Sequence, residues 1–240
     1  MARPVVRTNV PGGVHVVGVD TSGLAVTRAR LGHGADPAHV LAAAGWATRS
    51  AYSATVREDG ALELAYVVSR LDGIPPAAQE VPRDADVGPD EVGDAYQRVA
   101  AYAVITSARG VLLTQFNSLT AIPGHWGLPG GGLDEGEDPV AGVHREVWEE
   151  TGQQIALGQL VTIQSQHWVG RAPAGGVEDF HAVRIVFSAT CDDPSDPVIH
   201  DVGGTTSDAR WFARHEVEGL RMSSSWRGLA ALSEAISDAP

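Results

Sequence analysis

The sequence has little cysteine, little basic charge and no long apolar run. Its single cysteine, Cys191, excludes an intrachain disulfide bond and is typical of a reducing compartment. We interpret Cys191 as a small buried apolar residue. No apolar run approaches the ~20 residues of a membrane helix, and residues 1–10 carry arginines without the apolar core of a secretory signal. We therefore expect a cytoplasmic protein that does not enter a membrane.

Positive charge is scarce, because 17 basic residues stand against 30 acidic ones and the formal net charge is −13. An acidic chain is repelled by the phosphates of nucleic acids and of anionic membranes, so we expect neither as a partner. A polyphosphate can still bind if metal ions lie between the acidic side chains and its oxygens. At 240 residues the chain can hold one large domain or two small ones.

A segment rich in proline and acidic residues divides the chain. Residues 72–95 show neither a helical nor a strand period, so we interpret them as an irregular linker. The linker separates a small domain at 1–71 from a larger one at 96–240. In the small domain, hairpin and helix signals predict a ββαββ order, with strands at 14–19, 24–28, 51–57 and 61–68 and a helix at 38–44.

This small α+β domain shows no catalytic constellation. Its histidines, His15, His33 and His39, share no spacing typical of metal ligands, and we assign them surface or capping roles. A unit of about 70 residues is marginally stable alone, so we expect it to pack on the second domain or to form a homodimer. A role in shaping the substrate pocket stays open.

Strands and helices alternate in the second domain. Strands are predicted at 98–106, 110–116, 159–166, 180–189 and 210–212, and helices at 139–151, 216–220 and 223–236. Val183, Ile185 and Phe187 fall on one face of their strand with period two. This interleaving predicts an α/β class with a mixed sheet.

The stretch from Gly131 to Gln153 predicts a helix with defined ends. Asp138-Pro139 is a helix-start signal, since Asp supplies a capping oxygen and Pro is tolerated at the first helical position. Gly152 is a stop signal, because glycine adopts the left-handed conformation that ends many helices. The predicted helix therefore covers 139–151, and three valines at helical spacing form its buried stripe: Val140, Val143 and Val147.

Carboxylates are concentrated on one side of this helix. Glu146, Glu149 and Glu150 fall within an arc of roughly 100° beside the valine stripe. They repel one another unless a cation lies among them, and such oxygen ligands favour Mg²⁺ or Mn²⁺. Arg145 lies one turn before Glu149 and is placed to pair with it. Glu137 precedes the helix closely enough to join the cluster.

Seven residues in this stretch match the Nudix box, G-x5-E-x7-R-E-U-x-E-E-x-G-U, in which U is aliphatic: Gly131, Glu137, Arg145, Glu146, Glu149, Glu150 and Gly152. The sequence thus resembles the Nudix hydrolases from Gln97 to about Leu220. Val147 fills the first U, but polar Gln153 stands at the last, and we expect Ile155 to supply the missing apolar contact. The resemblance implies an α/β/α sandwich with a mixed sheet, here preceded by the small α+β domain.

The resemblance implies a reaction as well as a fold. Nudix enzymes use Mg²⁺ or Mn²⁺ to hydrolyse a pyrophosphate bond in a nucleoside diphosphate that is linked to another group. By match to the box, Glu146, Glu149 and Glu150 are the expected metal ligands, and Glu137 and Gly131 complete the expected metal site. We expect a small-molecule nucleotide as the substrate.

The general base varies within the family, so two kinds of candidate stand beside each other. One is a box glutamate, and the other is Glu178 in the glycine-rich loop that follows the box. We expect substrate contacts from the glycine-rich turn and from three side chains outside it; the candidates are Arg98, Gly131, Gly132, Trp168 and Arg184.

Two other functional classes stay open. One is a catalytically weak Nudix-fold sensor that binds a nucleotide metabolite, and the other is a regulatory interaction protein whose function lies in the first domain. Every acidic position of the box is present and neither flank shows a basic recognition helix, which favours the enzyme. Residues 165–168 partly resemble a signature of NADH hydrolases but lack its prolines, so the substrate is not identified.

Overall fold

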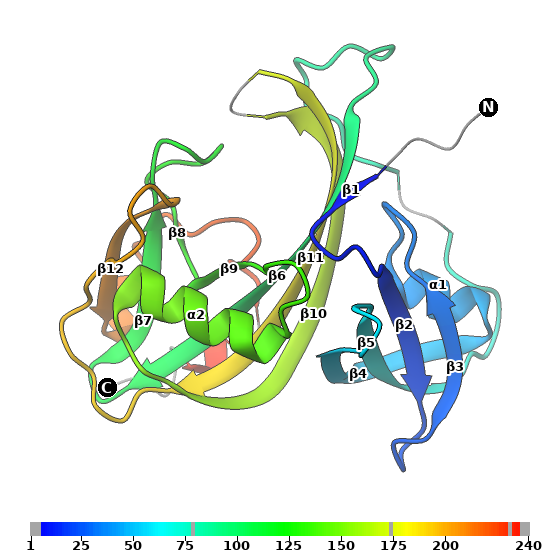
Figure 1. Ribbon diagram of the computed structural model, residues 1–240, viewed down its shortest axis with the longest axis horizontal. Helices are drawn as coiled ribbons and strands as arrows, with labels where there is room; N and C mark the ends of the chain where they lie inside the picture. Colours follow the sequence, from blue (N-terminus) through cyan, green and yellow to red (C-terminus); the bar gives the residue numbers. More distant parts are fainter. Residues whose placement is uncertain (1–5, 78–79, 173–174, 230–231, 236–240) are drawn as a thin grey trace. The chain divides into compact units, whose positions relative to one another are not determined.

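The computed structural model describes residues 6–77, 80–172, 175–229 and 232–235 (Figure 1). The chain folds into two compact units, each assembled from separate stretches of sequence. The first consists of Met1–Ala100, Gly132–Pro139 and Thr162–Ile185, and the second of Ala101–Gly131, Val140–Val161 and Val186–Pro240. Among the described residues, none of the helices has the length and apolar character needed to cross a bilayer.

The first unit contains a four-stranded sheet in the order β3-β2-β5-β4. β2 and β3 form an antiparallel hairpin, β2 runs parallel to β5, and β4 runs antiparallel to β5. The predicted ββαββ order is confirmed, and its elements are β2 (Val14–Val19), β3 (Ala25–Arg30), α1 (Pro37–Ala43), β4 (Trp46–Val56) and β5 (Leu62–Arg70).

Local signals set the turns of this sheet. Asp20 closes the first hairpin, because its Oδ1 atom accepts hydrogen bonds from the N–H groups of Ser22 and Leu24. Asp36 caps α1 by accepting a hydrogen bond from the His39 N–H at 3.0 Å. Gly45 follows the helix at a φ of 86°, and β4 begins at the next residue, earlier than predicted.

The larger sheet has eight strands in the order β10-β11-β6-β7-β12, with three short strands beside this path. Its members are β1 (Arg7–Thr8), β6 (Asp94–Ser107), β7 (Gly110–Phe116), β8 (Trp126–Gly127), β9 (Gly130–Gly132), β10 (Ala156–Arg171), β11 (Val177–Thr190) and β12 (Thr206–Phe212). β1 pairs parallel with β6, whereas β7 runs antiparallel to both β6 and β12. The predicted mixed sheet is confirmed, as is the α/β class.

The core of the second unit forms around β7 and the C-terminal segment. Trp126 meets Phe212 edge-on with ring centroids 4.7 Å apart, and Trp226 meets Tyr102 at 4.8 Å. The buried members of this core are Val104, Val111, Leu113, Trp126, Leu128, Val186, Phe212, Val217, Met222, Trp226, Leu229 and Leu232. The C-terminal tryptophan thus covers the start of β8 rather than facing solvent.

Several element boundaries differ from the sequence-based prediction. β6 and β10 are longer than the predicted ranges 98–106 and 159–166, because sheet pairing continues past the residues with clear alternation. A short helix, α3, covers Arg214–Val217 rather than 216–220. The predicted final helix is replaced by turns at 224–228, and helical residues appear only at 232–235, while Ile236 lies outside the described residues.

Candidate active site

The helix α2 runs from Pro139 to Thr151, as the capping signals predicted. Val143 and Val147 are fully buried, which confirms two of the three predicted stripe residues. Val140 is 42% exposed, so its assignment to the stripe was wrong. It lies in the first turn, and the buried face begins one turn later and continues through Glu150 and Thr151.

Glu146 lies directly against the glycine-rich turn. A Cβ atom built on Gly131 would lie 2.5 Å from Glu146 Oε2 and 2.6 Å from its Cδ atom. Only a residue without a side chain therefore leaves room for the Glu146 carboxylate at this place. The prediction that glycine allows a close approach is confirmed here for a carboxylate of the protein itself.

Arg145 connects two of the carboxylates. Its Nη1 atom lies 2.9 Å from Glu146 Oε1 and 3.0 Å from Glu149 Oε2, so the predicted pair with Glu149 is present. All three side chains are partly shielded, with exposed fractions of 27% for Arg145, 17% for Glu146 and 39% for Glu149. The guanidinium thereby fixes the relative positions of two acidic side chains one turn apart.

Glu150 is the buried member of the acidic set. Its carboxylate accepts hydrogen bonds from the Gly130 N–H at 2.9 Å and from the Thr206 hydroxyl. Burial raises the pKa of Glu150 to about 8, although both of these hydrogen bonds act in the opposite direction. Its two hydrogen-bond partners are neutral groups, so a nearby cation would stabilise the ionised carboxylate. Three oxygen donors in this setting fit a hard divalent ion such as Mg²⁺.

Thr206 is a residue that sequence reasoning missed. It begins β12 and lies 56 residues after Glu150 in the chain, so no local spacing connects them. Thr206 is 8% exposed, and the antiparallel pairing of β12 with β7 sets the position of its hydroxyl group. A pairing of strands that are distant in sequence is needed to identify it.

The second unit therefore brings together Gly131 and four side chains of α2 in the arrangement that the sequence predicted. A family model of the NUDIX domain matches residues 96–231, which is more than half of the chain. The chain belongs to the Nudix family.

Individual relatives match shorter parts of the chain. The MutT-like protein of Streptomyces ambofaciens is 39% identical over 83 residues, which are 30% of this chain and 54% of the relative. The chloroplastic Nudix hydrolase 26 of Arabidopsis thaliana is 34% identical over 76 residues, which are 32% of this chain and 32% of the relative. The chain thus spans about half or less of the length of these curated relatives.

Solved Nudix structures align over more of the chain at lower identity. The MutT protein from Methanosarcina mazei Go1 shares 20% sequence identity and a TM-score of 0.44, covering 67% of this chain and 96% of that one. Similarity of this size says nothing about the substrate of the present protein.

The departure from the Nudix box at Gln153 has a structural explanation. Gln153 is 3% exposed, and its Nε2 atom donates to the Thr151 carbonyl and to the Ser195 hydroxyl. Its Oε1 atom accepts a hydrogen bond from the Ser195 N–H at 3.0 Å. Polar bonds to the segment after β11 thus replace the family's apolar contact, while Ile155, the expected substitute, is half-buried. The nearby Cys191 is 3% exposed, as predicted for a buried apolar residue.

The remaining box residues lie in the first unit. A Cβ atom on Gly132 would lie 2.7 Å from Arg98 Nη2, so the guanidinium group of Arg98 rests against the glycine backbone. Glu137 accepts a hydrogen bond from the Asp134 N–H at 2.9 Å and closes the loop before α2. Arg98 and Gly132, two predicted substrate contacts, are therefore neighbours, and the metal role of Glu137 stays a prediction.

The other predicted site residues lie on long strands. Glu178 belongs to β11 rather than to a loop, because sheet pairing extends to Val177, and it forms an ion pair of 3.1 Å with Arg7. Trp168 lies against Phe180 with ring centroids 4.8 Å apart. Arg184 donates a hydrogen bond to Gln166 at 3.2 Å. The described contacts join none of these three side chains to another.

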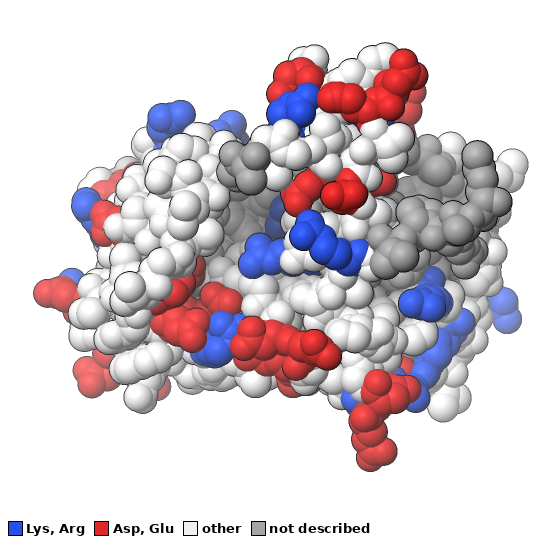
Figure 2. Space-filling model, turned by 45° about the horizontal axis from the view of Figure 1, so that its top comes forward, with Lys and Arg blue, Asp and Glu red and all other residues white. Residues whose placement is uncertain are grey.

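Ion pairs occupy many of the charged side chains. Figure 2 shows acidic residues in groups, with basic residues beside several of them. Arg171 bonds to Asp86 at 3.2 Å and to Glu91 at 3.0 Å, and Arg57 bonds to Glu63 at 2.9 Å. These arginines are compensated within the protein and do not form a free cationic surface.

Proposed function

We propose that the protein is a metal-dependent pyrophosphohydrolase acting on a nucleoside diphosphate linked to a second group. Water attacks one phosphorus atom, the anhydride P–O bond breaks, and the products are a nucleoside monophosphate and the phosphorylated second group. The observation that carries this proposal is the complete acidic set of α2. Glu146 and Glu149 are held by Arg145, and Glu150 is buried with neutral partners.

Glu146, Glu149 and Glu150 are the residues that would hold Mg²⁺ or Mn²⁺, with Gly131 and Glu137 as further participants. A bound ion of this kind neutralises phosphate oxygens and lowers the pKa of a nearby water. Thr206 and the Gly130 N–H orient the Glu150 carboxylate toward one geometry. Arg145 keeps the Glu146 and Glu149 carboxylates apart by a fixed guanidinium, and Gly131 leaves the space that Glu146 occupies.

The substrate's phosphates need cationic or N–H contacts from the protein. All 17 basic residues are arginines, so any basic side chain that touches a phosphate is a guanidinium. Arg98, which lies beside Gly132, is our first candidate, followed by Arg184. Trp168 is the candidate for stacking on a base, and Glu178 is the candidate base outside the box, which requires its pair with Arg7 to open.

The proposal is tested by hydrolysis assays with Mg²⁺ against NTPs, ADP-ribose, NADH, dinucleoside polyphosphates and sugar nucleotides. We expect the wild-type protein to release monophosphate from at least one of them, and Glu149→Gln and Glu150→Gln to abolish this release. Glu218→Gln is the matched control, because Glu218 is an exposed glutamate of the second unit outside the box. Circular dichroism spectra verify that each variant is folded.

The assay also separates the alternatives. Equal turnover by wild type and Glu150→Gln would refute the enzyme proposal. Tight nucleotide binding without turnover by the wild type would indicate a sensor, because such a protein keeps the pocket and lacks the reaction.

Two further expectations belong to the same proposal. We propose a homodimer formed through the first domain, and light scattering of the purified chain tests it by giving the mass of one or two copies. We also propose a cytoplasmic location, which the single buried thiol of Cys191 supports, since it needs no oxidising compartment. Fractionation of cells that express the protein tests the location.

A further inference from the structure

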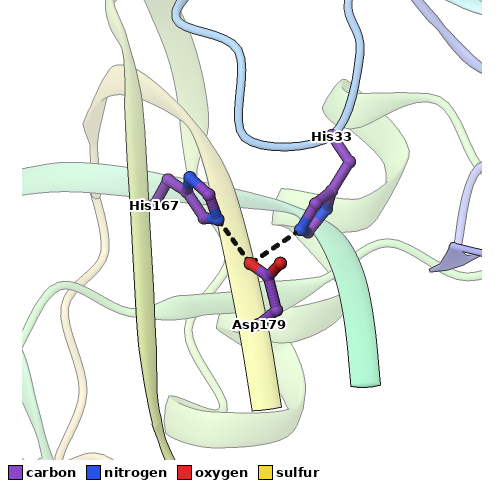
Figure 3. A group of neighbouring side chains, drawn as sticks. All are labelled: His33, His167 and Asp179. Carbon is purple, nitrogen blue, oxygen red and sulfur yellow. Dashed lines mark hydrogen bonds and ion pairs between the residues drawn. The ribbon is translucent and has the colours of Figure 1, made fainter. Parts of the chain in front are cut away.

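Three side chains outside the Nudix box meet in the first unit. Figure 3 shows His33, His167 and Asp179 pointing toward one another. His33 lies in the segment between β3 and α1, His167 on β10, and Asp179 on β11. Their nitrogen and oxygen atoms all lie within 4.8 Å of one another. Sequence reasoning gave His33 a surface or capping role, which was wrong, because its side chain is only 13% exposed.

Both imidazole rings are directed at the same carboxylate oxygen. His33 Nε2 lies 3.0 Å from Asp179 Oδ1, and His167 Nε2 contacts that oxygen as well. The His33 and His167 rings meet edge-on with centroids 5.1 Å apart. The side chains of His167 and Asp179 are 18% and 31% exposed, so the three groups are largely shielded from water.

A fourth histidine holds this arrangement without belonging to it. His181 is fully buried, and its Nδ1 atom accepts hydrogen bonds from the Gly34 N–H at 3.0 Å and from Gln97 Nε2 at 2.9 Å. Its Nε2 atom bonds to the Ser165 hydroxyl at 2.9 Å. Both ring nitrogens are therefore used, and His181 anchors the backbone next to His33 instead of offering a ligand atom.

Gly34 allows the segment that carries His33 to reach the strands. Its φ is 70°, and a Cβ atom at this position would lie 2.6 Å from Nδ1 and Cε1 of His167. Any larger residue would push the His167 ring away from Asp179. The backbone is thus shaped to bring one histidine of the loop and one of β10 to the same point.

Hydrogen bonding within the cluster leaves one polar atom without a partner. His33 Nδ1 is buried and has no hydrogen-bond partner among the described residues. Burial opposes ionisation of Asp179, but its hydrogen bonds with His167 and His33 outweigh burial and lower the pKa of its carboxyl group. The cluster therefore offers one carboxylate and two imidazole nitrogens that converge on a common centre.

We propose that His33, His167 and Asp179 bind a divalent transition metal ion of the Zn²⁺ type. Two imidazoles and one carboxylate are a common donor set for Zn²⁺, whereas Mg²⁺ favours oxygen ligands alone. Two ligands ~2.1 Å from a tetrahedral ion are ~3.4 Å apart, so His33 and Asp179, now 3.0 Å apart, separate by only ~0.4 Å on binding.

Three protein ligands leave one position of a tetrahedral ion for water or another small ligand. His33 and Asp179 line a cavity of about 660 Å³, which gives such a ligand space. The ion would join the loop before α1 to β10 and β11, and so stabilise the first unit. The box carboxylates of α2 take no part in this site, so the two sites select different ions.

Metal analysis of the untagged full-length chain tests the proposal. The protein is loaded with Zn²⁺ in excess Mg²⁺, dialysed, and its zinc content measured, with Co²⁺ absorption as a second readout of the ligand geometry. We expect one Zn²⁺ per chain in the wild type. Removing a ligand in His33→Gln, His167→Gln or Asp179→Asn should weaken binding by more than the ~10–100-fold typical of an outer-shell partner.

Two control variants make the result specific. His39→Gln removes another histidine of the first unit, which bonds to Asp36, and should retain zinc. Glu149→Gln removes a box carboxylate and should retain zinc as well. Zinc retained by the double variant His33→Gln/His167→Gln, or lost in Glu149→Gln, would overturn the proposal.

The wild-type protein alone is sufficient if the ligand variants do not fold. X-ray absorption at the zinc edge should then show two imidazole ligands in the bound ion's first shell. A shell of oxygen ligands only, or a wild-type chain that retains no zinc, would overturn the proposal.

Discussion

Replacing Gly131 by alanine should reduce activity while leaving the fold intact. The added Cβ would lie 2.5 Å from Glu146 Oε2, whereas ordinary van der Waals contact begins at 3.4 Å. The Glu146 carboxylate must therefore retreat by ~1 Å, which a flexible side chain can do without unfolding its helix. A displacement of ~1 Å at a catalytic group costs ~100-fold in rate, or ~2.7 kcal/mol of transition-state stabilisation.

The assay measures kcat/KM for the best substrate of the panel at saturating Mg²⁺, together with the melting temperature. The matched control is Gly176→Ala, because a Cβ atom at Gly176 meets nothing within 4 Å. We expect ~100-fold lower kcat/KM for Gly131→Ala only, with both melting temperatures within a few degrees of the wild type. Wild-type kcat/KM in a folded Gly131→Ala variant would refute the argument that Glu146 must lie against this turn.

Other predictions concern the contacts around α2. Arg145→Lys should lower kcat/KM about tenfold (~1.4 kcal/mol) in the same assay, because an ammonium group cannot hold both carboxylates as a planar guanidinium does; an unchanged value contradicts this. Gln153→Leu restores the family's apolar residue yet should lower the free energy of unfolding in urea by about 1 kcal/mol, since the Ser195 N–H loses its acceptor. Thr206→Val should cost about 1–3 kcal/mol by thermal unfolding, with Thr206→Ser close to wild type, because Glu150 keeps its hydroxyl donor only in the latter. Chelation of divalent ions by EDTA should stop hydrolysis, and added Mg²⁺ should restore it.

The helix α2 could be predicted from sequence because its determinants are local. Asp138-Pro139 and Gly152 mark its ends, and i, i+3 and i+4 spacings place Glu146, Glu149 and Glu150 on one side. The strand order of the N-terminal segment followed from hairpin and capping signals in the same way. The Gln153 departure also looked tolerable, but its hydrogen bonds to Ser195 could not be read from the box.

Contacts between distant segments could not be predicted. His33 and Asp179 are 146 residues apart, so no ligand spacing links them. Glu178 was expected in a loop, because its neighbouring glycines hide a strand that forms only when β11 pairs within the sheet. Thr206 reaches Glu150 through strand pairing alone. In each case the deciding interaction is tertiary, whereas the sequence pattern reports only near neighbours.

The assembly of the first unit from three stretches of sequence has a consequence for synthesis on the ribosome. The segment that carries His33 has its partners on β10 and β11, whose residues in this unit extend to Ile185. A nascent chain that has reached only the end of β5 therefore lacks the groups that hold this loop. The N-terminal sheet is made first but waits for more than a hundred further residues before its histidine finds Asp179.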